Sequence, residues 1–306
     1  MKCIFFLLSC VSGFIVNSPI NIYKTNINNQ VIKTYEPAIL NKENMNALIF
    51  YTGANSLIPA DIYSNFIRSL NNYNFSVSVV TNDNDATKDF LSNIKDTYKE
   101  IIPISHSSGY VNIINSVNKE KNINKGIFLD PVDNSFLVNN KFPFFNNNEN
   151  NNENNNWYNL NYIENILILR AEKSYKGSFF PKLEIPFIPA FALNSKKLED
   201  CNPDLIINKI SAENYGHSDV LDSLWADLMH GTLSKGNENR EQSNLDSYVD
   251  WLAQQIHEFV NKDTSDTSDT SDTNYENLNS VSSEEPTISN IYSNSLLNLY
   301  DEDRYI

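Results

Sequence analysis

The run Ser105-His106-Ser107-Ser108-Gly109 combines a hydroxyl nucleophile with the small neighbours that a sharp turn requires. It follows a short apolar segment and precedes a helical pattern, which is the setting of a nucleophile elbow. Such a strand-to-helix turn lifts one side chain clear of the sheet, so the residues two before and two after it must be small. Ser105 and Gly109 meet this demand around Ser107, although the first position is usually glycine.

A serine hydroxyl attacks a carbonyl carbon only when a base takes its proton. Hydrolases with this elbow carry the acid and the histidine later in the chain, in that order. Asp130 ends the next strand-like segment, and His217 follows the last one. Both would lie at the carboxyl ends of strands, where open parallel sheets keep their sites. Ser107, Asp130 and His217 are therefore the expected catalytic residues, and Asp133 is the alternative acid.

Each of these side chains also has an ordinary structural explanation. Asp130 precedes a proline and would end its strand through turn chemistry, while His217 would stand at the start of a helix. Beside the elbow, His106 is expected to orient the turn or to fill space. His230 and His257 fall on predicted helices, where surface or packing roles are typical.

The elements that must position these residues alternate between strand and helix patterns. Strands are predicted, from apolar runs and β-branched residues, at 21–25, 31–35, 47–51, 75–80, 101–104, 126–129, 163–169 and 205–210. Helices are predicted, from apolar residues three or four apart, at 61–70 (with Asp61 as N-cap), 111–117, 219–229 and 245–260. This alternation predicts one α/β domain over residues 18–261, with a mainly parallel central sheet and helices on both faces.

Composition excludes several classes of function. The 306 residues carry 38 acidic and 23 basic side chains, a net charge of −15, which repels a phosphate backbone and argues against nucleic-acid binding. Three cysteines cannot form a disulfide framework or a four-cysteine zinc site. The four histidines show no metal-ligand spacing, so no metal or other cofactor is expected.

Two biased segments lie within or after the predicted domain. Residues 144–157 are an Asn-rich insertion with no expected chemistry. Residues 262–306 hold ten acidic and two basic side chains and few apolar ones, which predicts a disordered tail. A solvated tail is the favoured interpretation of 288–306. The alternative is a weak partner motif, which would tether the domain.

The N-terminal residues 1–17 contain one lysine and a short apolar run. This pattern fits either a secretory signal or a buried first strand, and the run is too short for a stable membrane span. A signal would direct the protein to secretion or to an endomembrane lumen, whereas a buried strand would leave it in the cytoplasm.

The chain resembles α/β-hydrolases of the chlorophyllase-like group, which are related to platelet-activating-factor acetylhydrolases and polyester-degrading esterases. The segments that carry the resemblance are Ala47–Gly53, Ser105–Gly109, Leu129–Asp133 and Tyr215–Asp222. The chain departs from the family pattern at two positions. Thr52 stands where the family usually has histidine, and Ser105 replaces the elbow glycine.

The resemblance implies an α/β-hydrolase fold and a serine carboxylic-ester hydrolase that works through an acyl-enzyme without a cofactor. It implies Ser107 as nucleophile, Asp130 as orienting acid and His217 as general base. The backbone N–H groups of Ala54 and Ser108 would form the oxyanion hole.

Residues 177–193 join the segments that carry the acid and the histidine, and they are rich in proline and phenylalanine. Phe179, Phe180, Phe187 and Phe191 are expected to form a substrate wall for an apolar acyl or alcohol group. The expected partner is therefore a small-molecule or lipid-like ester. The alternative function is a non-catalytic, hydrolase-like binding protein, which the departures at Thr52 and Ser105 would favour.

Overall fold

The computed structural model describes residues 20–38, 42–80, 84–116, 123–132, 160, 162–176, 193, 195–229, 236–237 and 241–262. The predicted N-terminal segment, the Asn-rich insertion, the four phenylalanines of the substrate wall and the acidic tail lie outside these ranges. Within them, no helix combines the length and apolar character needed to cross a membrane.

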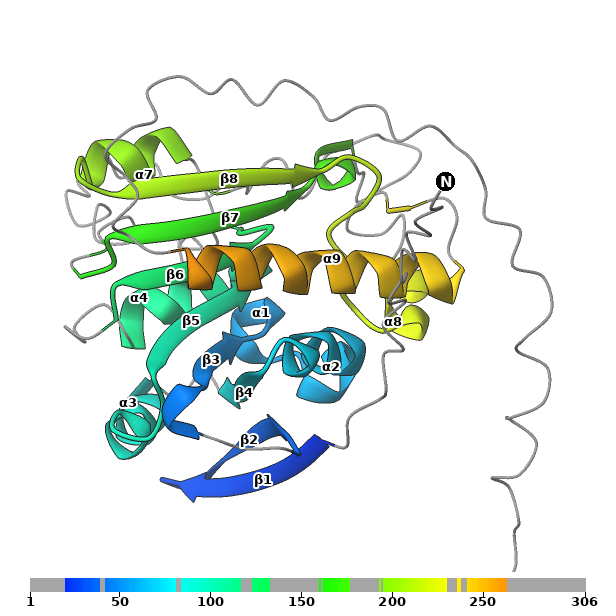
Figure 1. The fold of residues 1–306 in the computed structure, drawn as a ribbon. Helices are drawn as coiled ribbons and strands as arrows, with labels where there is room; N and C mark the ends of the chain where they lie inside the picture. Colours follow the sequence, from blue (N-terminus) through cyan, green and yellow to red (C-terminus); the bar gives the residue numbers. More distant parts are fainter. Residues whose placement is uncertain are drawn as a thin grey trace, which may run out of the picture. The chain divides into compact units, whose positions relative to one another are not determined.

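A single eight-stranded sheet organises the described part of the chain (Figure 1). Its strands are β1 (Ile20–Ile27), β2 (Gln30–Pro37), β3 (Asn46–Tyr51), β4 (Phe75–Val80), β5 (Glu100–His106), β6 (Lys125–Leu129), β7 (Asn165–Ala171) and β8 (Ile206–Ala212). They are ordered β1-β2-β4-β3-β5-β6-β7-β8. The first two strands form an antiparallel hairpin, and β2 runs antiparallel to β4. Neighbouring strands in the remaining order β4-β3-β5-β6-β7-β8 are parallel. This is the α/β-hydrolase fold.

Strand β3 shows why the sheet forms where the sequence predicts it. Its six residues, Asn-Ala-Leu-Ile-Phe-Tyr, are all buried, as expected of a strand covered on both faces. Leu48 and Phe50 belong to one hydrophobic core, whereas Ile49 and Tyr51 belong to the other. This alternation follows from the period of two along a strand.

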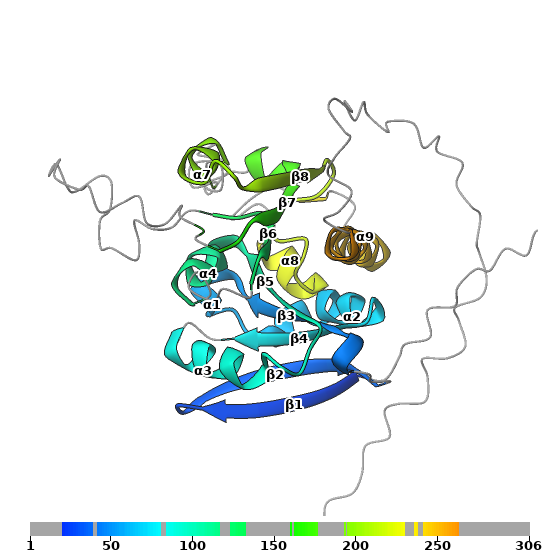
Figure 2. The same ribbon diagram turned by 60° about the vertical axis from the view of Figure 1, so that its left-hand side comes forward.

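Helices cover both faces of the sheet (Figure 2). The helical elements are η1 (Lys42–Asn44), α1 (Gly53–Ser56), η2 (Ala60–Tyr63), α2 (Ser64–Asn72), α3 (Asn84–Ile94), η3 (Ser107–Gly109), α4 (Tyr110–Ser116), η5 (Glu172–Lys176), α7 (Ser195–Cys201), α8 (Ser223–Met229) and α9 (Gln242–Asn261). Buried residues of α2, α8 and α9 form the core on one face, and those of α3, α4 and α7 form the core on the other. The predicted two-sided α/β architecture is therefore confirmed.

The chain changes the direction of its crossovers at the neighbouring strands β3 and β5. After β3 it runs to α2 on one face, whereas after β5 it runs to α4 on the opposite face. The carboxyl ends of these two strands therefore form the topological switch point of the sheet. In open α/β sheets this switch point is where ligands bind.

Two predicted helix starts are wrong. Helix α2 begins at Ser64 after the short 3-10 element η2, so Asp61 does not cap it; the Asp61 carboxylate instead pairs with Lys33 at 3.0 Å. The carboxylate of Asp222 accepts from the backbone N–H groups at the start of α2, at 3.3 and 3.0 Å. The helix predicted at 219–229 also starts later than expected, because α8 begins at Ser223. At α2, the distant side chain of Asp222 thus replaces the local cap that the sequence pattern favours.

Candidate active site

The turn between β5 and α4 places Ser107 at this switch point. Ser107 has a φ of 55°, in the left-handed region that serine rarely adopts. Its side chain is partly exposed, whereas its neighbours on both sides are buried. Gly109 is required here because a Cβ atom would lie 2.4 Å from the carbonyl oxygen of Tyr51 and 2.7 Å from that of Thr52. This is the geometry of a nucleophile elbow.

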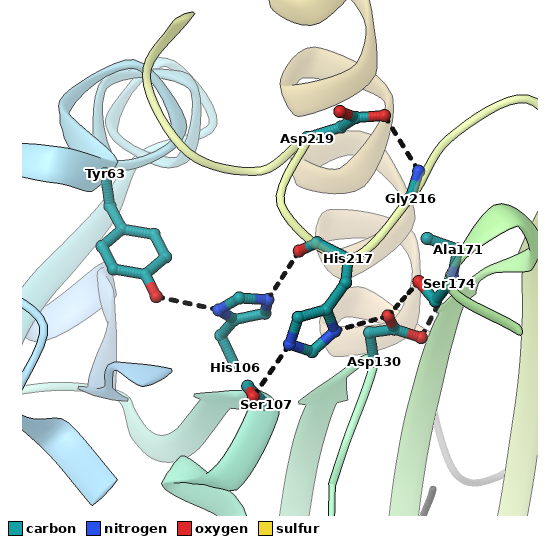
Figure 3. A network of polar contacts seen from close by, with 9 residues as sticks. All are labelled: Tyr63, His106, Ser107, Asp130, Ala171, Ser174, Gly216, His217 and Asp219. Atoms are coloured by element: carbon teal, nitrogen blue, oxygen red, sulfur yellow. Dashed lines mark hydrogen bonds and ion pairs between the residues drawn. The ribbon is translucent and has the colours of Figure 1, made fainter. Parts of the chain in front are cut away.

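Ser107, His217 and Asp130 are hydrogen-bonded in one line (Figure 3). The Ser107 Oγ atom lies 2.8 Å from His217 Nε2. On the other side of the ring, His217 Nδ1 lies 2.7 Å from Asp130 Oδ2. Both the histidine and the aspartate are buried, at 4% exposure each. The three side chains come from the ends of β5 and β6 and from the segment after β8, as expected from the sequence.

Asp130 is fixed by contacts beyond the histidine. Its backbone N–H donates to the carbonyl of Leu169 at 2.7 Å, and its φ is 43°. The hydroxyl of Ser174, in η5 after β7, donates to Asp130 Oδ2. The backbone N–H of Ala171 points at Oδ1 from 3.4 Å. These donors stabilise the ionised carboxylate and set its orientation toward the ring of His217.

The segment that carries His217 is held on both sides. The buried Asp219 carboxylate accepts from the backbone N–H of Gly216 at 2.9 Å. The ring of Tyr215 stacks on Tyr248 of α9, with 4.1 Å between centroids and 8° between planes. The sequence suggested only a turn here, but these contacts anchor the histidine on the long C-terminal helix.

The loop after β3 lies against the elbow. Thr52 Oγ1 donates to the carbonyl of Ile58 at 2.7 Å, and the backbone N–H of Gly53 donates to the hydroxyl of Tyr63 at 3.1 Å. Ala54 follows at the start of α1, and α1 contacts η3, which contains Ser108. The two residues expected to form the oxyanion hole are therefore on facing segments. Here the loop is held by Thr52 and Tyr63.

Strained backbone is concentrated in this region. Seven non-glycine residues of the described ranges have positive φ, and three of them are asparagines, which tolerate it. The other four are Ala54 (50°), Ser56 (63°), Ser107 (55°) and Asp130 (43°). All four belong to the loop after β3, the elbow or the acid. Left-handed backbone in such residues persists only where the surrounding structure enforces it, and it gathers at functional sites.

His106 is the other histidine of the site, and the sequence left its role open. It is buried, at 3% exposure, with its ring between Tyr63 and His217. Burial lowers the pKa of His106 well below the usual range, and the neighbouring His217 lowers it further. His106 is therefore neutral near pH 7 and serves as a fixed hydrogen-bonding group.

Some expected residues cannot be compared with the structure. The alternative acid Asp133 and the substrate-wall phenylalanines lie outside the described residues, as does His230. His257 lies on α9, with its ring centroid 5.1 Å from that of Tyr73. In the described part of the chain, no three His, Cys, Asp or Glu side chains converge as metal ligands would.

Sequence reasoning did not find Ser174 or Tyr63. Both contact the site through tertiary structure, across 44 and 43 positions of the chain respectively. No local motif marks either residue, because a serine after a strand and a tyrosine before a helix are common.

Comparisons with known proteins find structural neighbours but no relative in sequence. No protein-family model matches the sequence, and no curated protein is significantly similar to it. Among solved structures, the chain is similar to the esterase domain of a Rhodothermus marinus protein, with 11% identity, 79% and 100% of the two chains covered and a TM-score of 0.47. A Pyrobaculum calidifontis esterase gives 11% identity, 80% and 87% coverage and a TM-score of 0.48. A sugar hydrolase from Lactococcus lactis gives 15% identity, 78% and 100% coverage and a TM-score of 0.49.

Proposed function

We propose that the protein is a serine carboxylic-ester hydrolase that works through an acyl-enzyme. One observation carries this proposal: the unbroken hydrogen-bonded line from Ser107 Oγ through His217 to Asp130, with 2.8 Å and 2.7 Å between the bonded atoms. A nucleophile next to a base that is itself oriented by a third group is the arrangement of nucleophilic acyl transfer.

The protonation states of the resting site follow from what each atom can accept. The Asp130 carboxylate only accepts, so His217 carries its proton on Nδ1 and its Nε2 accepts from the Ser107 hydroxyl. As the Ser107 oxygen bonds to the ester carbonyl carbon, its proton passes to Nε2. Asp130 then stabilises the imidazolium while remaining ionised itself.

The carbonyl oxygen becomes negatively charged in the tetrahedral intermediate and needs hydrogen-bond donors. The backbone N–H groups of Ala54 and Ser108 fill this role in the proposal, and a donor of this kind contributes about 10²–10³ in rate. When the intermediate collapses, the imidazolium gives its proton to the leaving alkoxide and the acyl group stays on Ser107. Water, deprotonated by His217, then releases the acid.

The substrate class rests on the sequence. The resemblance to the chlorophyllase-like group and the aromatic side chains Phe179, Phe180, Phe187 and Phe191 favour an ester with an apolar acyl or alcohol group. Fold and triad do not fix a substrate, so acyl-chain profiling is part of the test.

The test is hydrolysis of p-nitrophenyl esters of short and medium acyl length by wild type and by Ser107→Ala. Wild type is expected to turn over and to be labelled once by a fluorophosphonate, at Ser107. Ser107→Ala is expected to lose both properties. Ser247→Ala, which removes an exposed hydroxyl on α9, is the matched control and should behave as wild type. Turnover that survives Ser107→Ala, or a wild type with neither turnover nor labelling, would contradict the proposal and favour a binding protein.

A further inference from the structure

Tyr63 and His106 connect the loop after β3 with the segment that carries His217 (Figure 3). The hydroxyl of Tyr63 lies 2.8 Å from Nδ1 of His106. Nε2 of the same ring lies 3.0 Å from the backbone carbonyl oxygen of His217. On the other side, the backbone N–H of Gly53 donates to the Tyr63 oxygen at 3.1 Å. These bonds connect Gly53, the residue before Ala54, with the backbone of His217.

The direction of every bond in this connection is determined. The carbonyl of His217 only accepts, so the proton of His106 is on Nε2. Nδ1 then has a lone pair, and it accepts from the Tyr63 O–H, which keeps its proton because burial raises the pKa of Tyr63. The Tyr63 oxygen in turn accepts from Gly53. No donor or acceptor in the line is left without a partner, which buried polar groups require.

Packing leaves the connection little freedom. The rings of Tyr63 and His106 meet edge to face with 5.6 Å between centroids, and the rings of His106 and His217 are 4.7 Å apart. A Cβ atom on Gly53 would lie 3.2 Å from the Tyr63 hydroxyl and 3.3 Å from His106 Nδ1. A movement of either side chain would therefore displace the loop after β3 or the backbone of His217.

We propose that Tyr63 and His106 are a positioning pair that holds the base His217 in place relative to the loop after β3, which carries Ala54; this inference rests on the proposed function. In the network of Figure 3, neither side chain is hydrogen-bonded to Ser107. In this mechanism His106 keeps its proton throughout turnover. The pair acts by holding the His217 backbone, so that the imidazole stays aligned between Ser107 and Asp130. A misalignment of about 1 Å at such a site costs about 10²-fold in rate.

The experiment compares Tyr63→Phe, His106→Gln and His106→Asn with wild type on a medium-chain p-nitrophenyl ester. Each kcat is divided by the fraction of active sites titrated with a fluorophosphonate. Tyr63→Phe removes only the hydroxyl and is expected to lower kcat by about 10-fold to 100-fold, with KM within about twofold. The glutamine amide can reach the His217 carbonyl as Nε2 does, whereas the shorter asparagine cannot. His106→Gln keeps the bond to the His217 carbonyl but gives up the acceptor for Tyr63, so it should lose about as much as Tyr63→Phe, and His106→Asn, which loses both bonds, should lose more.

The matched control is Tyr98→Phe, because the Tyr98 hydroxyl is also hydrogen-bonded in a partly buried position, to Glu36 and Ser76, far along the sheet. It should change kcat by less than about twofold. Equal activity of Tyr63→Phe and wild type would overturn the inference. So would equal losses in the two His106 variants, or a loss that disappears after active-site titration, since that would indicate misfolding alone. A wild type without turnover or labelling would contradict the proposed function instead.

One measurement is independent of turnover. Long-range ¹H–¹⁵N NMR of the histidine rings reports which nitrogen carries the proton. His106 is expected as the neutral Nε2–H form in wild type from pH 6 to pH 8. In Tyr63→Phe its Nδ1 signal should change, because the bond from the hydroxyl is lost. A wild-type His106 protonated on Nδ1 would overturn the inference whatever the kinetics show.

Discussion

The imidazole rings of His106 and His217 lie 4.7 Å apart with 33° between their planes, yet their hydrogen bonds assign them different tasks. His217 has the Ser107 hydroxyl on one nitrogen and the Asp130 carboxylate on the other. His106 donates to the backbone carbonyl of His217 and accepts from Tyr63. Only His217 is therefore placed to take a proton from the nucleophile, and a charge on His106 would oppose the imidazolium beside it.

The buried His106 makes stability depend on pH. Burial lowers the pKa of His106 well below 6.5, so the native state keeps the ring neutral where the unfolded chain protonates it. Below about pH 6.5 the unfolded state then binds more protons, and the free energy of unfolding falls as pH falls. The contribution of one such group is at most about 1.4 kcal/mol per pH unit. Urea unfolding between pH 7.5 and pH 5 measures it.

His106→Gln separates this effect from that of other groups, because glutamine does not titrate. Below about pH 6.5 the free energy of unfolding of this variant should fall less steeply with falling pH than that of wild type. The difference between the two slopes should correspond to at most one bound proton. Above that pH the two slopes should agree. Parallel curves over the whole range would contradict a neutral buried His106.

Asp130→Asn is expected to lower kcat by about 10⁴, the magnitude known for the acid of a protease triad. An amide at this position would donate toward His217 Nδ1 or leave it without an acceptor, which favours the wrong tautomer. Asp133→Asn, three positions further along the chain, is the control and should cost little. If Asp133→Asn proved the more damaging change, the acid role would move to that residue.

Ser174→Ala tests the support of the acid. Its hydroxyl donates to the oxygen of Asp130 that also bonds His217, and a hydrogen bond to a charged group contributes about 1.5–3 kcal/mol. We expect kcat to fall by about tenfold or more with little change in KM, because the carboxylate loses its orientation. Initial rates over a range of ester concentrations measure both constants. Unchanged kcat would show that the remaining contacts of Asp130 suffice.

Gly109→Ala is expected to be severely destabilising, by more than about 4 kcal/mol, because its Cβ would lie 2.4 Å from a backbone oxygen that cannot move aside. Gly126→Ala in β6 is the matched control. There a Cβ would meet only side-chain atoms, at 3.5 Å or more, which is ordinary contact. Its unfolding midpoint in urea should stay close to that of wild type, while Gly109→Ala should be insoluble or unfold at much lower urea.

The sequence predicts the strands well because apolar runs such as 47–51 and 75–80 have only one way to become buried, within a sheet covered on both faces. The order of elbow, acid and histidine follows from the same parallel sheet, whose carboxyl ends meet at one edge. Ser107, Asp130 and His217 could thus be placed together from the sequence alone.

The contacts that hold the site could not be predicted in this way. Ser174, Tyr63 and Asp222 reach their partners across long stretches of chain, and nothing in their local sequence specifies the partner. Asp61 illustrates the opposite error, since it has the right type for a helix cap but pairs with Lys33 instead. Local patterns identify an element of secondary structure, whereas these hydrogen bonds depend on how the folded elements pack against one another.

The segments that carry the nucleophile and the base are packed into the two hydrophobic cores on opposite faces of the sheet. Ser107 is continuous with α4, whose buried residues belong to one core, while His217 precedes Val220 and Leu221, which belong to the other. The distance between the Ser107 hydroxyl and His217 therefore depends on how both cores pack against the sheet. Repacking of either core alone is therefore expected to lower turnover before it lowers the melting temperature, because a small shift between the two cores misaligns Ser107 and His217.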